Sequence, residues 1–315
     1  MSDVHLSSRP IQDVEVPVTG RYRSLGLDRN PFAGSGPLVS LPGQQSALAE
    51  IRGWVDAVSA DRAREDRLAV LTGEPGMGRS RLLREIAGAA SAPVIDPGKG
   101  NLTDAQLLRA MVDAFGGTAT GRTGMDLRRD IRLALADLPA GTAPGLLIDD
   151  ADFTGSRLEL IRNVLRDGAE HGLWIVIAGQ PDLADRVERR RSLKAILGPL
   201  ARVSPPEDDD LRAVIASRAG HQVLAQAAID AAVELAGGNP GRALRLAEVA
   251  VELAARQGLP DVDRTSVLAA TRRIEDGAPA AREAVQVEIP LLPGADSGER
   301  GPATMQRSLW DMEGS

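Results

Sequence analysis

The stretch LAVLTGEPGMGRS at residues 68–80 joins a short apolar run to a glycine-rich turn. The residues that follow, RLLREI at 81–86, carry apolar side chains at the spacing of one helix face. A strand, a glycine-rich loop and a helix N-terminus in this order are typical of a phosphate-binding loop, because N–H groups and the helix dipole then point at one anion. The stretch therefore predicts a nucleotide site, and the residues expected to surround the nucleotide are Gly73, Glu74, Pro75, Gly76, Met77, Gly78, Arg79, Ser80 and Arg81.

Arg79 is the one departure from the pattern G-x-x-x-x-G-K-[ST], which has lysine at this position. Ser80 fits the pattern, with a hydroxyl group placed to meet Mg²⁺. Arginine keeps the charge of lysine, but its guanidinium is larger and planar, so we expect nucleotide binding to survive. We expect hydrolysis to be slow or absent, because a misplacement of about 1 Å can cost about 10²-fold in rate. The chain has only two lysines, Lys99 and Lys194, so a general preference for arginine also accounts for Arg79.

The composition is that of a globular protein with an aliphatic core. Hydrophobic residues make up 43% of the 315 residues and charged residues 26%, whereas aromatic residues make up only 2%. This balance favours helices and parallel strands over a sandwich of sheets. The absence of cysteine excludes disulfides, thiolate metal sites and cysteine nucleophiles. No apolar run is long enough to span a membrane and the start of the chain lacks the apolar core of a signal peptide, so we expect no membrane insertion and a cytoplasmic location.

Polar side chains follow two further apolar runs. Asp149 and Asp150 come directly after LLI at 146–148, and Gln180 follows LWIVIAG at 173–179. A phosphate-binding loop needs a second acid that reaches Mg²⁺ from the end of a neighbouring buried strand, and Asp149 fits this position. Asp150 is then placed to polarise the attacking water, and Gln180 to touch that water or the terminal phosphate from a strand between the other two. In the alternative interpretation, the acids solvate a strand end and Gln180 lies in an ordinary turn.

The pattern of apolar residues changes near Pro205 and Pro206, where strands give way to helices only. Before the prolines we predict strands at 68–72, 94–95, 146–150, 173–178 and 202–203, helices at 45–60, 80–90, 101–115, 126–138 and 154–168, and a turn at 41–44. After them we predict helices at 208–218, 227–236, 240–257 and 263–274. The fold class is therefore α/β, with a three-layer α-β-α parallel-sheet core at 21–205 and a small all-helical domain at 206–275. A disordered arm at 1–20 and a disordered tail at 276–315 are expected to flank them, with Phe32 anchoring the N-terminal segment on the core.

Arg242 is a further candidate for the nucleotide site. The sequence GGNPGR at 237–242 predicts a tight turn and a helix that begins near Pro240. Arg242 then lies in the first turn of that helix, where the helix dipole disfavours a cation. An arginine in this position is better explained by a nearby anion such as a phosphate, although a solvated arginine is the alternative.

Taken together, these segments resemble an AAA+ ATPase of the ExeA-like and transposition-helper group, which is related to the origin-recognition and clamp-loader branch. The loop at 73–80 resembles the Walker A motif of that family, and LLIDDAD at 146–152 its Walker B motif. AGQPDL at 178–183 resembles the sensor 1 strand and GGNPGR at 237–242 the sensor 2 motif. The segments LGL at 25–27 and NPF at 30–32, together with GQPDL, point to the ExeA-like group.

The resemblance implies a P-loop NTPase core with a helical AAA+ lid, and ATP and Mg²⁺ at their junction. It also implies a homo-oligomer in which an arginine of one subunit enters the site of its neighbour. Arg202 is the candidate for this catalytic role, and the run of Arg189, Arg190 and Arg191 is the alternative. The sequence departs from the family at Arg79, and at Asp150, where the family usually has the longer glutamate.

The leading hypothesis is an AAA+ ATPase that hydrolyses ATP slowly with Mg²⁺ to switch or remodel a partner protein or a protein–DNA assembly. The net charge of −7 favours a protein partner over a long nucleic acid. One alternative is a nucleotide-binding scaffold that no longer hydrolyses ATP, which Arg79 and Asp150 favour. Another is an ATP-dependent DNA-binding regulator of the transposition-helper type.

Overall fold

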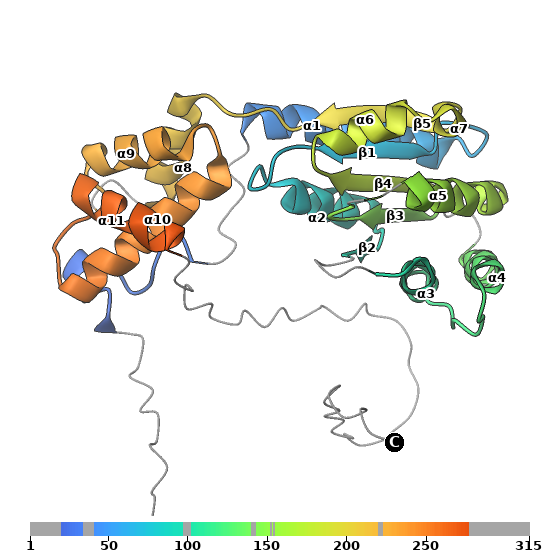
Figure 1. The fold of residues 1–315 in the computed structure, drawn as a ribbon, viewed down its shortest axis with the longest axis horizontal. Coiled ribbons are helices and arrows are strands. Elements are labelled where there is room, and N and C mark those ends of the chain that lie inside the picture. Colours follow the sequence, from blue (N-terminus) through green and yellow to red (C-terminus); the bar gives the residue numbers. More distant parts are fainter. Residues whose placement is uncertain are drawn as a thin grey trace, which may run out of the picture. The chain divides into compact units, whose positions relative to one another are not determined.

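Apolar runs of the sequence form a five-stranded parallel sheet in the computed structural model of the chain (Figure 1). The strands lie in the order β2-β3-β4-β1-β5. All residues of β1, β3 and β4 are buried, as expected for parallel strands that are covered on both faces. The strands are β1 Leu68–Thr72, β2 Val94–Ile95, β3 Gly145–Ile148, β4 Trp174–Gly179 and β5 Leu197–Arg202.

The structure describes residues 20–33, 41–96, 102–139, 143–151, 153, 155–219 and 223–276. These ranges include every residue that the sequence predicts at the nucleotide site. The predicted disordered arm at 1–20 and disordered tail at 276–315 lie, except for residues 20 and 276, outside the described residues.

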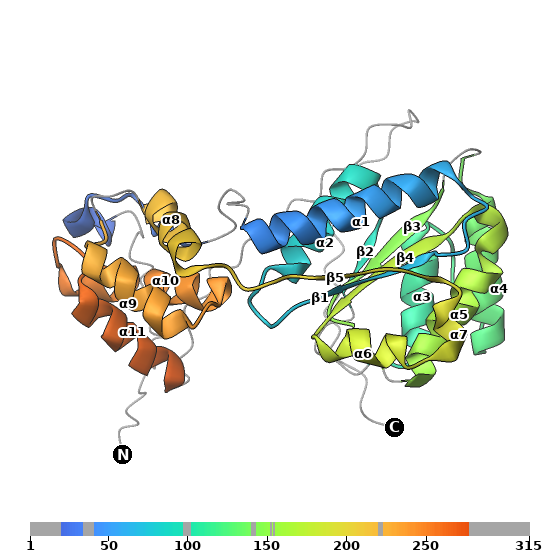
Figure 2. The same ribbon diagram turned by 90° about the horizontal axis from the view of Figure 1, so that it is seen from above.

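Helices cover both faces of the sheet, so this part of the chain has the three layers that the sequence predicts (Figure 2). Successive side chains of β1 point to opposite faces: Leu68 and Val70 pack in one apolar cluster, and Ala69 and Leu71 in the other. The first cluster includes the inward faces of α3 to α7, and the second those of α1 and α2. The helices are α1 Pro42–Ala60, α2 Arg79–Ala90, α3 Asp104–Ala114, α4 Gly124–Ala136, α5 Gly155–Asp167, α6 Asp182–Glu188 and α7 Arg191–Lys194, with the short 3-10 helix η3 at Ala169–His171.

The C-terminal part of the described chain is helical, as predicted, and its helices share a third apolar cluster that is rich in alanine. Tyr22, Leu25 and Phe32 of the N-terminal segment are buried in this cluster. Phe32 therefore anchors its segment on the C-terminal helices, and the prediction that it packs on the α/β core is wrong. The Asn30 side chain adds a bond from its Nδ2 to the Glu248 carbonyl, at 2.8 Å. The elements are the 3-10 helix η2 Arg23–Leu25 and the helices α8 Asp208–Ala219, α9 Gln226–Ala236, α10 Pro240–Gln257 and α11 Arg264–Glu275.

Strand β3 ends at Ile148 and not at 150, and α3 begins at Asp104 and not at 101. Two further predicted boundaries are wrong, and each of these errors involves proline and glycine. Helix α1 begins at Pro42, where the sequence predicts a turn, because proline suits the first helical position. Strand β5 is longer than the predicted pair at 202–203, because Pro199 is tolerated on the edge strand of a sheet. Arg202 is therefore the last residue of β5.

Candidate phosphate-binding site

The glycine-rich loop lies between β1 and α2, at the edge of the sheet where the parallel strands end. Strand β4 lies between β1 and β3, with Thr72 opposite Gly179 and Ile148 opposite Ile177. The residues that follow these strands, Gly73, Asp149 and Gln180, therefore share one edge of the sheet. Two strand spacings separate β1 from β3, which is about 10 Å. The strand order is the one that the sequence interpretation requires, with Gln180 after the strand between the loop and the acids.

The loop backbone takes a conformation that only glycine adopts readily. Gly76 and Gly78 have φ angles of 87° and 89°, in the left-handed region. Gly78 is the N-cap of α2, so the loop passes directly into the helix. Met77 is buried in the cluster beneath the loop, and its N–H donates to the Glu74 carbonyl at 3.2 Å. The apolar anchor and the turn hold the loop in place, while the first N–H groups of α2 lack partners within the helix, as at every helix start.

Arg79 is the first residue of α2, and one end of its guanidinium group is buried without a partner. Its Nη1 atom is shielded from solvent and has no hydrogen-bond acceptor among the residues that the structure describes. A buried donor without an acceptor is costly, and more so when the group is charged. An anion beside the loop would remove this cost. The arginine thus fits the role of a phosphate ligand.

The two acids after β3 have different environments. Asp149 is buried, and its Oδ1 accepts a hydrogen bond from the Asp150 N–H at 2.9 Å. The Asp149 N–H donates to the Ile95 carbonyl at 2.8 Å, so the residue is fixed to β2 as well. Asp150 is exposed and has a φ angle of 44°, which is rare for a residue with a side chain. One carboxylate is therefore held in place, and the other projects from a strained backbone.

The donor set suits Mg²⁺ held together with a phosphate. No cluster of three or more histidine, aspartate or glutamate side chains that could hold a metal ion occurs within the described ranges. Mg²⁺ at nucleotide sites is usually held by one or two carboxylates together with phosphate oxygens and water. Ser80, in the first turn of α2, and Asp149 are the side chains that would hold it.

The three remaining predicted site residues are exposed. Gln180 follows β4, and Arg202 ends β5. Arg242 lies in the first turn of α10, with its Nη2 3.8 Å from Glu275 Oε1. Both side chains of that pair are more than half exposed, so the ion pair contributes little and leaves the guanidinium available.

The arginine run that is the alternative to Arg202 spans the junction of α6 and α7, where Arg189 and Arg190 lie between the helices and Arg191 begins α7. Arg190 is partly buried, with its Nη1 3.6 Å from Glu159 Oε1, whereas Arg189 and Arg191 are exposed. Arg190 is thus engaged within its own chain.

Arg218, near the end of α8, is a candidate that the sequence does not single out. Its Nε is buried without a hydrogen-bond partner among the described residues. Burial lowers the pKa of Arg218, and repulsion from Arg81 lowers it further. A cation repelled by Arg81, which lies in the first turn of α2, would gain from an anion between them. Arginine in the last turn of a helix is common, so the sequence carries no sign of this role.

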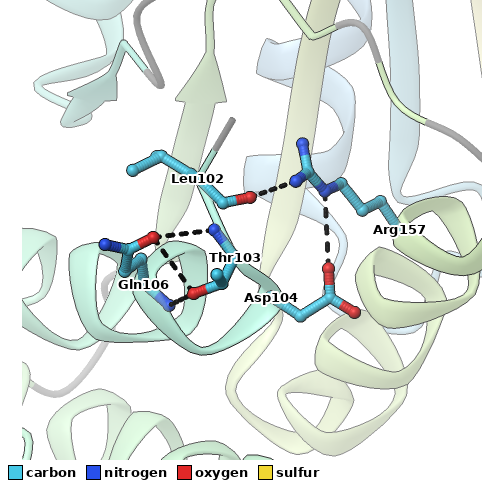
Figure 3. Close-up of polar contacts among 5 residues, drawn as sticks. All are labelled: Leu102, Thr103, Asp104, Gln106 and Arg157. Carbon is cyan, nitrogen blue, oxygen red and sulfur yellow. Dashed lines mark hydrogen bonds and ion pairs between the residues drawn. The ribbon is translucent and has the colours of Figure 1, made fainter. Parts of the chain in front are cut away.

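Arg157 ties the start of α5 to the start of α3, next to this edge of the sheet (Figure 3). Its guanidinium donates to the Leu102 carbonyl, and its Nε lies 3.4 Å from Asp104 Oδ1. Thr103 and Gln106 form a reciprocal capping box at the start of α3. Helix α5, which follows the two acids in the chain, is thus held to α3 at its first turn.

Comparisons with known proteins agree with the fold. Residues 62–187 match a family model described as an AAA domain. No sequence among the curated proteins matches the chain. Among solved structures, the chain is similar to the Aeropyrum pernix ORC1 protein in complex with DNA, with a TM-score of 0.61 and 22% identity over 76% of this chain and 67% of that chain.

Two further structures show the same similarity. Cdc6p from Pyrobaculum aerophilum has a TM-score of 0.65 and 16% identity, over 79% of this chain and 71% of that chain. The ORC2 protein of Aeropyrum pernix in its ADPNP-ADP complexes has a TM-score of 0.61 and 14% identity, over 82% of this chain and 75% of that chain. At these identities the similarity establishes the fold, which is that of a P-loop NTPase with a helical C-terminal region. In the described part of the chain, no helix has both the length and the apolar character to cross a membrane.

Proposed function

We propose that the chain is an AAA+ ATPase that binds ATP and Mg²⁺ at the loop of residues 73–80 and hydrolyses ATP slowly. The observation that carries the proposal is the buried, unpartnered Nη1 of Arg79 at the N-terminus of α2, inside a loop of the phosphate-binding pattern. The fixed carboxylate of Asp149 would hold Mg²⁺ together with Ser80. Asp150 and Gln180 would orient the attacking water, and Arg242 would approach the phosphates from α10.

The expected output is a switch between nucleotide states. ATP bound between the core and the C-terminal helices would favour one arrangement of them, and hydrolysis would release it, so the affinity for a partner would change. We place the chain in the ExeA-like and transposition-helper group, on the segments LGL, NPF and GQPDL. The partner would be a protein or a protein–DNA assembly, and a neighbouring subunit would supply Arg202 to the site. The AAA domain match and the similarity to an ORC2 protein with bound nucleotides support the AAA+ nucleotide-binding part of this proposal.

Turnover and binding, measured side by side, test the proposal. The native chain should bind Mg·ATP and hydrolyse it slowly, and Arg79→Lys should raise turnover by at least about tenfold, because the compact ammonium fits between the phosphates. Arg84→Ala removes an exposed arginine from the same helix and is the matched control, with no expected change. Binding without turnover in both the native chain and Arg79→Lys would instead indicate the nucleotide-binding scaffold.

A DNA-binding regulator is the second candidate, favoured by the similarity to the ORC1 protein in complex with DNA. Titration of duplex DNA at low salt, with and without Mg·ATP, distinguishes a DNA-binding regulator from an ATPase that acts on a protein partner. Affinity that falls steeply with salt would support DNA binding. No binding at low salt would remove this candidate.

A further inference from the structure

Three consecutive carbonyl groups of the glycine-rich loop are held by residues from outside the loop. The Pro75 carbonyl accepts from Asn239 Nδ2 at 2.7 Å, and the Gly76 carbonyl from the Gly241 N–H at 3.0 Å. The Met77 carbonyl accepts from Gln44 Nε2 at 2.9 Å. Asn239 and Gly241 lie at the start of α10, whereas Gln44 lies in the first turn of α1. The loop is thus held from the C-terminal helices and from the α/β core.

These bonds fix the direction of the loop's N–H groups. In a trans peptide the carbonyl of one residue and the N–H of the next point in opposite directions. A Pro75 carbonyl held by Asn239 therefore turns the Gly76 N–H away from Asn239, and a Met77 carbonyl held by Gln44 turns the Gly78 N–H away from Gln44. N–H groups turned inward in this way are what a phosphate-binding loop offers to its ligand.

The glycines of the loop fit these contacts closely. A Cβ atom on Gly76 would lie 2.4 Å from Asn239 Oδ1, and one on Gly78 would lie 2.7 Å from Gln44 Nε2. A Cβ atom on Gly241 would lie 2.7 Å from the Gly76 Cα. The absence of side chains at these three positions allows the Asn239 and Gln44 side chains and the Gly241 backbone to approach the loop.

Asn239 uses both ends of its side-chain amide, which sets it apart from other capping residues. Its Oδ1 accepts from the Arg242 N–H at 2.9 Å and so caps α10, which leaves Nδ2 to donate to Pro75. Aspartate and serine also make good N-caps, but aspartate lacks the donor and serine is too short to replace the amide. The cap and the bond to the loop can therefore be separated by substitution.

We propose that Asn239 and Gln44 are positioning residues that set the loop for phosphate, and that Asn239 links nucleotide binding to the C-terminal helices through the loop backbone. This inference rests on the proposed function. A nucleotide that favours an inward Gly76 N–H also favours an outward Pro75 carbonyl, so it strengthens the bond from Asn239 and with it the neighbouring Gly241 contact at the start of α10. Coupling between two sites is reciprocal, so loss of the Asn239 bond lowers the affinity for the nucleotide by the same factor by which the nucleotide strengthens that bond.

Mg·ADP binding to the full chain tests the proposal without turnover. Asn239→Ser and Asn239→Asp both keep the cap of α10, and each should lower the affinity for Mg·ADP about 3- to 10-fold. The loss should be larger in Asn239→Asp, because its carboxylate faces the Pro75 carbonyl and repels it. Gln44→Glu should act in the same direction. Gln257→Glu, an exposed position in the last turn of α10, is the charge-matched control and should not change the affinity.

Hydrogen exchange supplies the readout that a purely structural role would not change. In the native chain, Mg·ADP should slow exchange of the Gly241 amide, and in Asn239→Ser this slowing should be reduced at an unchanged melting temperature of the free protein. Native affinity in Asn239→Ser and Asn239→Asp, or undiminished slowing at Gly241, would overturn the proposal. Failure of the native chain to bind Mg·ADP would overturn the proposed function itself, and with it this inference; failure confined to the predicted effects in the variants would overturn this inference alone.

Discussion

Asp150 combines an exposed carboxylate with a backbone conformation that is unfavourable for its residue type. Its φ angle of 44° lies in the left-handed region, where a non-glycine residue usually carries strain of roughly 1–3 kcal/mol. Among the described residues, the other non-glycine residue with a positive φ is Ser91, at the end of α2. Strain of this kind persists where the surroundings fix the residue, and here Asp149 binds the Asp150 N–H. Asp150 directly follows the proposed Mg²⁺ ligand, Asp149, in the chain.

Replacement of Asp150 by glycine should separate stability from activity. Asp150→Gly relieves the backbone strain, so it should leave the free energy of unfolding unchanged or raise it by about 1 kcal/mol, while ATP turnover falls at least about tenfold. Ser91→Gly is the matched control, because it relieves a similar backbone strain away from the acids and should leave turnover unchanged. Denaturant unfolding and steady-state turnover measure the two quantities. Full turnover in Asp150→Gly would refute the assignment of Asp150.

The connection between α3 and α4 depends on a buried carboxylate. Asp130, inside α4, accepts hydrogen bonds from the Gly121 N–H at 2.7 Å and the Thr120 N–H at 2.8 Å. The Gly121 bond, followed by those from Thr120, outweighs burial and lowers the pKa of the Asp130 carboxyl. Because the folded pKa lies below the unfolded value of about 3.9, the stabilisation is complete above that pH and is lost as the pH falls through the folded pKa.

Asp130→Asn should therefore destabilise the fold in a pH-dependent manner. The neutral amide accepts the same N–H groups less strongly, so the variant should unfold at lower denaturant than the native chain at pH 7. The difference should shrink as the pH falls below about 4, because the carboxyl is then protonated in the unfolded chain before it is protonated in the folded chain. Asp113→Asn, on the exposed side of α3, should show no such difference. A gap between Asp130→Asn and the native chain that stays constant down to pH 3 would contradict this account.

The elements that the sequence predicts best are those with the strongest apolar pattern. The runs of β1, β3 and β4 are buried on both faces and have no glycine or proline in their interior, so their places follow from hydrophobicity alone. Strand β5 contains Gly198 and Pro199, and only its edge position makes this sequence compatible with a strand. The start of α1 is missed for a similar reason, because proline is common both in turns and at the first position of a helix, and Pro42 occupies the helix start.

The phosphate-binding loop is local in sequence, and the contacts that hold it are not. Residues 73–80 follow a pattern with fixed spacing, so their place in the fold is predictable. Asn239 lies 164 residues along the chain from Pro75, whose carbonyl it binds, and Gln44 lies 33 residues from Met77, whose carbonyl it binds. Arg218 likewise meets Arg81 only in the folded chain. No local pattern encodes such pairs, because they depend on how separate elements pack.

At the scale of the whole molecule, we propose that a second copy of the chain completes the site. Arg202 is exposed at the end of β5, the edge strand beside β1, and is available to a neighbouring subunit. A cation supplied in trans can stabilise the charge that develops in phosphoryl transfer, and the effect is commonly large, about 10³–10⁵-fold in rate. Turnover per chain should therefore rise with protein concentration.

Mixing two inactive variants tests this expectation. Arg202→Ala keeps its own site but supplies no arginine, whereas Asp149→Asn loses the Mg²⁺ ligand but supplies Arg202. Each variant alone should have little turnover, and an equimolar mixture should regain a clear fraction of the native rate. Arg191→Ala is the comparison, because Arg191 belongs to the alternative run and should keep native turnover. A mixture no more active than its components would exclude Arg202, and loss of turnover in Arg191→Ala would favour the alternative.

The central claim is that residues 73–80 hold a magnesium nucleotide, and calorimetric titration of Mg·ATP into the native chain tests it most directly. We expect about one nucleotide per chain, with a dissociation constant of about 1 μM to 1 mM, which is the range in which the Michaelis constants of enzymes usually lie. Asp149→Asn should lose the magnesium dependence of binding, and Arg84→Ala should bind as the native chain does. Absence of binding to the native chain at millimolar Mg·ATP, or magnesium-dependent binding that is unchanged in Asp149→Asn, would contradict the account.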